Sequence, residues 1–135
     1  MRITGPDDRL YVVVGVLSNA SGQWLLQQRP AGKPCAHQWE FPGGKVEDNE
    51  SPYQALSREM HEELGISIHK AIPLTHVSQD YAHARVWLDV YVIESYSGEV
   101  TARENQQVAW LSPKEISRKE VLPPVYPILD ALEAS

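Results

Sequence analysis

Three glutamates in one predicted helix are the residues of this sequence whose types and spacing are best suited to chemistry. At 100° per residue, Glu59, Glu62 and Glu63 fall on one arc of a helix. Like charges three and four residues apart repel by a few tenths of a kcal/mol per pair, so the arc is costly unless a cation lies among the carboxylates. Carboxylate oxygens suit hard cations, and Mg²⁺ is often held by few protein groups together with substrate phosphates. The arc therefore predicts a Mg²⁺ site, with Mn²⁺ as the alternative.

The helix that must position these glutamates has start and stop signals. The Ser51 side chain can cap the free N–H groups at the start of the helix, and Pro52 suits the first helical position. Gly65 suits the left-handed backbone conformation that commonly ends a helix. Beside the acidic arc lies a predicted apolar stripe, which we expect to pack against a sheet. The stripe comprises Tyr53, Leu56, Met60 and Leu64.

The segment before this helix adds a tight turn and a positive charge. Residues 42–44 (Pro-Gly-Gly) form a turn whose bare backbone can approach a metal or a phosphate closely, and Lys45 follows it. On the helix, Arg58 is placed where pairing with Glu50 would pin the loop to the helix.

The segment of residues 44–66 matches the motif of the Nudix hydrolases at every fixed position, so the chain resembles that family. Chance agreement at seven fixed residues is on the order of one in a billion per starting point. The fixed positions are Gly44, Glu50, Arg58, Glu59, Glu62, Glu63 and Gly65. The resemblance implies an α/β (α+β) fold, the α/β/α sandwich with a mixed β-sheet flanked by helices. The alternation of predicted strands and helices leads independently to the same architecture.

Nearly the whole chain is similar to the MutT branch of that family. The similarity is carried by QQRPAG, WEFPGGK, SGEV, ENQQVAWLSP and LPPVYPILDAL. It implies a Mg²⁺-dependent enzyme that cleaves 8-oxo-dGTP, or a related oxidised purine nucleotide, to the monophosphate and pyrophosphate. Such an enzyme sanitises the nucleotide pool and so serves DNA repair.

The resemblance also implies roles for individual residues. Glu59 would be the general base or an essential metal-site carboxylate, and Glu50 would hold Arg58. The cation would be bound by the Gly43 carbonyl, Glu59, Glu62, Glu63 and Glu104. Phosphate would be bound by Arg29 and Lys45. The rest of the nucleotide would meet Phe41, Arg85, Val125 and Tyr126, with a plain surface arginine as the alternative reading of Arg85.

Base recognition is the point at which the sequence departs from the MutT pattern. An asparagine before the last helix bonds the oxidised guanine in that branch, and here Val125 takes its position. Tyr126 could stack on a base or pack within the C-terminal segment. The departure leaves open a related class that hydrolyses cytidine and modified-pyrimidine triphosphates, and more remotely dinucleoside polyphosphates. A catalytically silent Nudix sensor is an alternative from another class, although all the motif carboxylates are present.

Length and composition restrict the partners and the compartment. We expect one domain spanning residues 1–135, and a monomer with a weak dimer as the alternative. The net charge of −6 argues against polymeric nucleic acid and remains compatible with a small nucleotide. The single Cys35 excludes an internal disulfide, and no signal peptide or membrane-spanning run is visible, so we expect a cytoplasmic protein.

Hydrophobic patterning predicts the remaining elements. A central strand is expected at residues 10–17, forming a hairpin with a strand at 24–28. A second hairpin is expected from strands at 74–79 and 86–93. The later predictions are a strand at 108–111, a short helix from Ser112 and a closing helix at 127–134.

Overall fold

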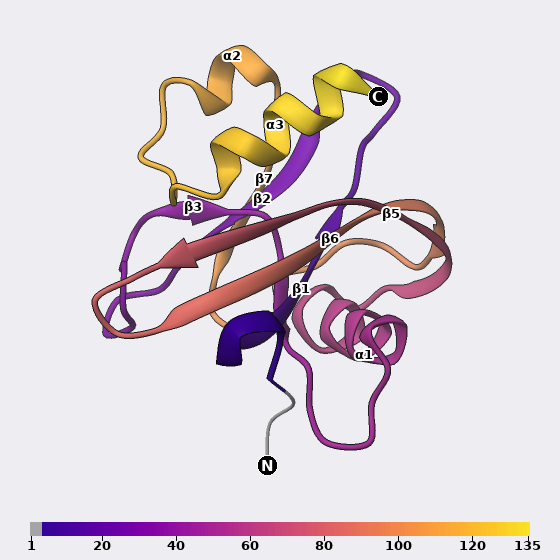
Figure 1. Ribbon diagram of the computed structural model, residues 1–135. Helices are drawn as coiled ribbons and strands as arrows, with labels where there is room; N and C mark the ends of the chain where they lie inside the picture. The colour runs from indigo at the N-terminus through magenta and orange to yellow at the C-terminus, as the bar shows by residue number, and fades with distance from the viewer. Residues whose placement is uncertain (1–3) are drawn as a thin grey trace.

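Two β-sheets and three α-helices make up the part of the chain, residues 4–135, that the computed structural model describes (Figure 1). The larger sheet is mixed, because β1 pairs in parallel with β6 and its other neighbours are antiparallel. Its strand order is β4 (Gly43–Lys45), β1 (Leu10–Val16), β6 (Arg85–Ser97) and β5 (Ser67–Asp80). The smaller sheet is antiparallel, in the order β3 (Trp39–Glu40), β2 (Trp24–Gln28) and β7 (Gln107–Leu111). A single 3-10 turn, Pro6–Asp8, precedes β1.

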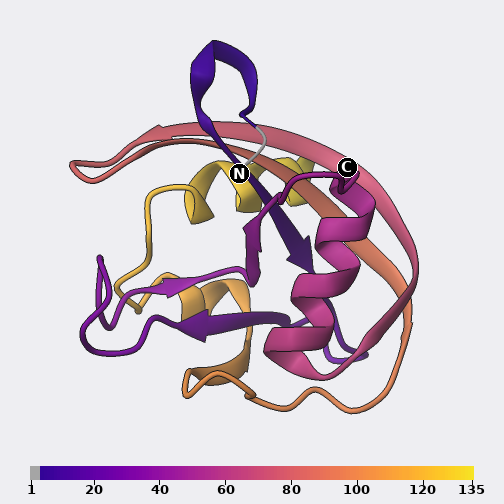
Figure 2. The ribbon, with the colours of Figure 1, turned by 90° about the horizontal axis from the view of Figure 1, so that it is seen from below.

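The helices cover opposite faces of the larger sheet, which confirms the predicted fold class. Alternation along β1 sends Val13 into the core beneath α1 (Pro52–Leu64) and Val14 into the core beneath α3 (Val125–Ala134). The short helix α2 (Pro113–Ile116) adds Ile116 to this second core. Figure 1 shows α1 and α3 on opposite sides of the long β5–β6 hairpin, and Figure 2, seen from below, shows the hairpin curving around α1.

Both ends of α1 are as the sequence predicts. The Ser51 hydroxyl accepts a hydrogen bond from the Gln54 N–H at 3.1 Å, and the Gln54 side chain accepts one from the Ser51 N–H at 2.8 Å. Gly65 ends the helix with φ +72°, the left-handed conformation that favours glycine. The cap at Ser51 and the left-handed Gly65 therefore set the two ends of the helix that carries the acidic residues.

The apolar stripe of α1 is confirmed except at its first residue. Leu56, Met60 and Leu64 are fully buried, whereas the Tyr53 side chain is 40% exposed, so its place in the stripe was wrong. Ala55, two residues after Tyr53, is fully buried instead, so the buried face of the helix begins there. Glu63, predicted on the acidic arc, is also buried at 4% exposure.

The first predicted hairpin is wrong, because β1 and β2 belong to different sheets. Both sides of β1 are already paired, with β4 and β6, while β2 lies between β3 and β7. The chain still turns at residues 19–22, where the Asn19 side chain accepts bonds from the N–H groups of Ser21 and Gln23. Next to the turn, the Asn19 N–H donates to the Gln23 carbonyl and the Leu25 N–H donates to the Leu17 carbonyl, both at 3.1 Å, and an isolated bridge pairs Ser18 with Trp24.

The second hairpin is confirmed, but its strands are longer than the sequence suggests. β5 continues through Pro73 because it is the edge strand of its sheet, where proline removes no needed donor. Similarly, α3 begins at Val125, two residues before Pro127, because the N–H groups of the first helical turn have no acceptor within the helix and the N–H that proline lacks is not needed there.

Among residues 4–135, no helix has the length and apolar character needed to cross a membrane.

Candidate active site

Arg58 is the centre of a hydrogen-bonded group that joins α1 to the loop before it. Its Nε and Nη2 donate to the two oxygens of Glu50 at 2.6 and 3.0 Å. Its Nη1 donates to Glu59 at 2.8 Å and to Glu62 at 3.3 Å, and Nη2 also donates to the Lys45 carbonyl at 2.9 Å. Side-by-side bonds of this kind are the strongest that a guanidinium makes with a carboxylate. The predicted pairing of Arg58 with Glu50 is confirmed, and we call these five residues the Arg58 network.

The charges in this group stabilise one another. The hydrogen bond from the Arg58 guanidinium holds the pKa of Glu50 below its usual value, and the hydrogen bonds that Arg58 donates to Glu50 and Glu59 raise the pKa of Arg58. Glu50 and Arg58 therefore both stay charged near neutral pH.

Two glycines allow the backbone to pass close to its neighbours, Gly44 to Glu59 of the Arg58 network and Gly43 to the backbone of β1. A Cβ on Gly44 would lie 2.2 Å from the Glu59 carboxyl carbon, and one on Gly43 would lie 2.0 Å from the Val13 carbonyl oxygen. A side chain at Gly43 would collide with the backbone of β1, and one at Gly44 would displace the Glu59 carboxylate. The Glu59 carboxylate therefore packs directly on the backbone at Gly44.

Glu63 has one oxygen with a partner and one without. Its Oε1 accepts a hydrogen bond from Gln27 at 2.8 Å, while its buried Oε2 has no partner. Burial, with the nearby carboxylates of Glu59 and Glu104, raises the pKa of Glu63. A buried oxygen without a partner beside two further carboxylates is the chemistry expected of a cation site.

The carboxylates expected to bind the cation do not all lie close together in the structure. Among residues 4–135, no group of three or more His, Cys, Asp or Glu side chains is arranged to hold a metal ion. Glu62 is 49% exposed and turns toward Arg58, which explains why it does not join Glu63. Glu104 is exposed in the loop before β7.

A cavity of about 490 Å³ opens next to Gly43 and Gly44. It is lined by both predicted phosphate-binding residues, Arg29 and Lys45, and by Gly43 and Gly44. Apolar side chains from the sheet and from the C-terminal segment form most of the remaining wall. This apolar wall comprises Leu10, Val12, Val14, Phe41, Val86, Leu88, Leu122, Val125 and Ile128.

Arg29 is held in place by the segment that follows it. Its Nε donates to the Pro34 carbonyl at 2.6 Å, and its Nη1 lies 3.2 Å from Oε2 of Glu40, which also lines the cavity. Burial raises the pKa of Glu40, although the Arg29 guanidinium opposes that shift. The sequence prediction missed Glu40, whose only signal was its place in WEFPGGK.

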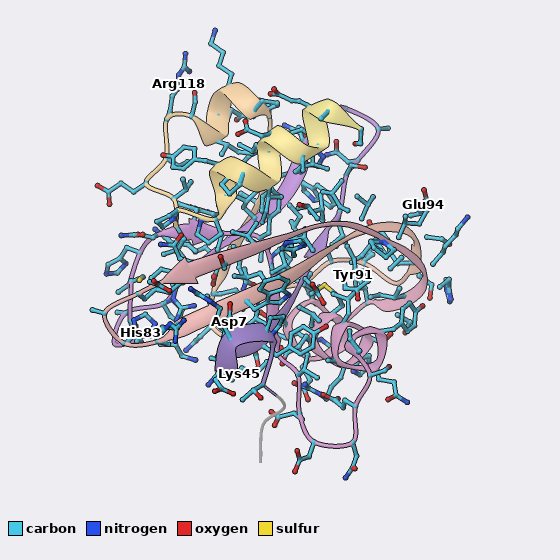
Figure 3. All side chains as sticks on the ribbon, in the orientation of Figure 1. Asp7, Lys45, His83, Tyr91, Glu94 and Arg118 are labelled. Atoms are coloured by element: carbon cyan, nitrogen blue, oxygen red, sulfur yellow. The ribbon has the colours of Figure 1, made fainter. Side chains whose placement is uncertain are left out.

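Two loops complete the cavity rim. Cys35 comes from the loop after β2, and Tyr81 and His83 come from the β5–β6 turn, where their rings stack at 5.1 Å. Burial and the neighbouring Cys35 raise the pKa of Tyr81 to about 12, so its hydroxyl stays protonated. Figure 3 shows Lys45 and His83 at the lower left, with Arg118 far from them at the top beside α2.

The structure separates the predicted nucleotide contacts into two sets. Phe41 and Val125 line the cavity and are buried, at 4% and 1% exposure. Tyr126 is 59% exposed and lies outside the cavity, because the next position on α3 faces away from the sheet. Arg85 also lies outside it, 3.8 Å from Asp80 across the turn.

Comparison with known proteins decides the family. The NUDIX domain family matches residues 8–132. The chain belongs to the Nudix hydrolase family. Nudix hydrolases generally use divalent metal ions.

Relatives place this Nudix hydrolase in the MutT type. It is 35% identical to a CTP pyrophosphohydrolase of Escherichia coli (strain K12) over 93% of both chains. It is 34% identical to an 8-oxo-dGTP diphosphatase of Proteus vulgaris, over 71% of this chain and 86% of the relative. The crystal structure of a MutT Nudix hydrolase from Burkholderia pseudomallei superposes with a TM-score of 0.82 at 26% identity, covering 90% of this chain and 96% of the other.

Proposed function

We propose that this Nudix hydrolase cleaves 8-oxo-dGTP, or a related oxidised purine nucleoside triphosphate, to the monophosphate and pyrophosphate. The observation that carries the proposal is a single cavity that joins two kinds of wall. Arg29, Lys45 and Gly44, which packs on Glu59, line it, and so does an apolar wall of the kind that receives a base.

The residues of the chain suit attack of water on a phosphorus of the triphosphate. Glu59 is positioned as the general base, because its carboxylate is held by Arg58 at 2.8 Å and lies against Gly44 at the cavity. It takes the proton of the attacking water as the new P–O bond forms. Arg29 and Lys45 offset the charge that builds on the departing pyrophosphate when the bridging P–O bond breaks.

The acidic residues fit a divalent cation. The Glu63 oxygen without a partner and the repulsion among neighbouring carboxylates are the observations that support this fit. Mg²⁺, with Mn²⁺ as the alternative, would be held by the Gly43 carbonyl, Glu59, Glu62, Glu63 and Glu104. When bound, the cation supplies a Lewis acid that offsets phosphate charge.

Cytosine nucleotides are the second candidate substrates. Val125 offers the cavity no hydrogen bond to a purine edge. The relative matched over 93% of both chains is named a CTP pyrophosphohydrolase. The apolar wall of the cavity is compatible with either base.

The test compares kcat/KM for 8-oxo-dGTP, dGTP, dCTP and 5-methyl-dCTP with Mg²⁺ under one set of conditions. We expect 8-oxo-dGTP to exceed dGTP and dCTP by roughly tenfold or more, the discrimination that one or two base contacts can give. A large preference for the cytosine nucleotides would replace the first proposal with the second. Absence of pyrophosphate release from every nucleotide would favour the catalytically silent sensor.

A further inference from the structure

Two buried glutamines outside the Nudix motif connect α1 with the loop that carries Glu104. Gln27 lies in β2 and Gln106 lies next to β7, and their side chains are only 7% and 8% exposed. Burying an amide is costly unless its hydrogen bonds are satisfied, so two adjacent buried amides call for a reason beyond packing.

The hydrogen bonds of these amides run in one direction. The Glu104 N–H donates to Gln106 Oε1 at 2.7 Å, and Gln106 Nε2 donates to Gln27 Oε1 at 3.3 Å. Gln27 Nε2 then donates to Glu63 Oε1 at 2.8 Å. Each amide uses its oxygen toward the loop and its nitrogen toward the helix. The series ends on one oxygen of Glu63 and leaves the other without a partner.

The same loop is docked on the last turn of α1. The Thr101 N–H donates to the Leu64 carbonyl at 2.9 Å, and the Arg103 N–H donates to the Glu63 carbonyl at 3.0 Å. Gln106 Nε2 donates to that same Glu63 carbonyl at 3.0 Å. Carbonyls of the last helical turn have no hydrogen-bond donor within the helix, and here the loop provides those donors. Gln106 thus contacts both the backbone of α1 and the Gln27 amide.

We propose that Gln27 and Gln106 are positioning residues, which orient Glu63 and the backbone at Glu104 for binding a divalent cation. The proposal rests on the metal-dependent function proposed above. A neutral amide suits this task, because it fixes one carboxylate oxygen without cancelling the negative charge that attracts the cation. A lysine or arginine at either position would neutralise that charge.

The test replaces each amide by methionine, which keeps the volume and removes the hydrogen bonds. Binding of Mn²⁺ without nucleotide is measured by calorimetry for Gln27→Met and Gln106→Met, and circular dichroism checks folding. The matched control is Gln107→Met, at the exposed neighbouring position in β7. We expect the dissociation constant for Mn²⁺ to rise roughly 10–100-fold in the two buried variants, as for other partners of metal ligands, and to stay unchanged in the control.

Kinetics separate positioning from a general structural role. In the buried variants, the Mg²⁺ concentration for half-maximal rate should rise by a similar factor, while kcat at saturating Mg²⁺ stays within about threefold of the parent. Gln106→Asn keeps an amide that is too short to reach both acceptors, and it serves if a methionine variant fails to fold. Its affinity for Mn²⁺ should also fall.

The outcomes distinguish this proposal from the function on which it rests. Unchanged Mn²⁺ affinity in the folded variants would overturn the positioning role alone, as would an equal loss in Gln107→Met. Absence of Mn²⁺ binding by the parent protein, together with a rate of pyrophosphate release that does not depend on Mg²⁺ or Mn²⁺, would overturn the metal-dependent function and the positioning role with it.

Discussion

The Arg58 network and the apolar wall of the cavity are fixed by different forces. In the network, a guanidinium makes directional bonds of 2.6–3.3 Å to Glu50, Glu59, Glu62 and the Lys45 carbonyl. Replacement of Arg58 leaves all four partners without these bonds, and replacement of one partner leaves part of the guanidinium unpaired. The apolar wall, with Val125 and Phe41, is fixed by packing, which tolerates exchanges of similar volume at less than about 1.5 kcal/mol.

This difference separates the reaction from the choice of substrate. The groups that would carry bond cleavage depend on residue identity, whereas the surface that would meet the base depends mainly on shape. A Nudix hydrolase can therefore keep its reaction while its substrate changes through a few substitutions in the wall. The relatives named for 8-oxo-dGTP and for CTP are consistent with this division.

The largest effect is expected in the Arg58 network, from Glu59→Gln. In the parent, Glu59 accepts a hydrogen bond of 2.8 Å from Arg58. Glutamine keeps an oxygen that can accept this bond, but it cannot take the proton of the attacking water. We expect kcat to fall by about 10²–10⁴-fold, with the melting temperature nearly unchanged. Pyrophosphate release and thermal unfolding measure the two quantities. Turnover close to that of the parent would sink the assignment of Glu59 as the base.

Arg58→Lys should damage the same network through its geometry. A single ammonium cannot span Glu50, Glu59 and the Lys45 carbonyl at once. Because the Arg58 side chain is 28% exposed, we expect the free energy of unfolding to fall by only about 1–2 kcal/mol. Misplacement of Glu59 should lower kcat by roughly 10–100-fold.

Urea denaturation and steady-state kinetics measure the Arg58→Lys variant. The control is Arg118→Lys, which lies beside α2 at the far end of the molecule (Figure 3). Equal behaviour of the two variants would show that the network contributes no more than an ordinary surface arginine.

A smaller effect is expected in the apolar wall, from Val125→Asn. The side chain is 1% exposed and lines the cavity, so burial of an amide should cost about 1–3 kcal/mol of stability. The new hydrogen-bonding group should raise the ratio of kcat/KM for 8-oxo-dGTP to that for dCTP by roughly tenfold. Val125→Ala is the control, because it changes volume without adding polarity. A ratio that moves equally in both variants would contradict recognition at this position.

Tyr126→Ala should have the smallest effect. Tyr126 is 59% exposed and lies outside the cavity, so the free energy of unfolding should change by less than about 0.5 kcal/mol. We also expect kcat/KM for every nucleotide to stay within about twofold of the parent, as for other surface positions away from a site. A rise of KM confined to one base would show that Tyr126 reaches the substrate when it is bound.

Prediction from sequence succeeded where the contacts are close along the chain. The capping of α1 by Ser51, its stop at Gly65 and the pairing of Arg58 with Glu50 all lie within one short segment. The burial of Glu63 could not be predicted in this way, because its partner Gln27 is 36 residues away. The failed hairpin has the same origin, since the partners of β1 are set by strands distant in sequence.

The sequence by itself determined that the chain is a MutT-type Nudix hydrolase with an acidic helix behind a glycine turn. The family follows from the match to the Nudix motif, whereas helical periodicity and the spacing of capping, acidic and basic residues specify the helix and its contacts within a few turns. Only the tertiary structure decided which of the expected residues line the cavity and which others join them. It added Glu40, left Tyr126 and Arg85 outside, and buried Gln27 and Gln106 behind Glu63. Those placements depend on how two sheets and three helices pack, and packing joins residues that no local pattern connects.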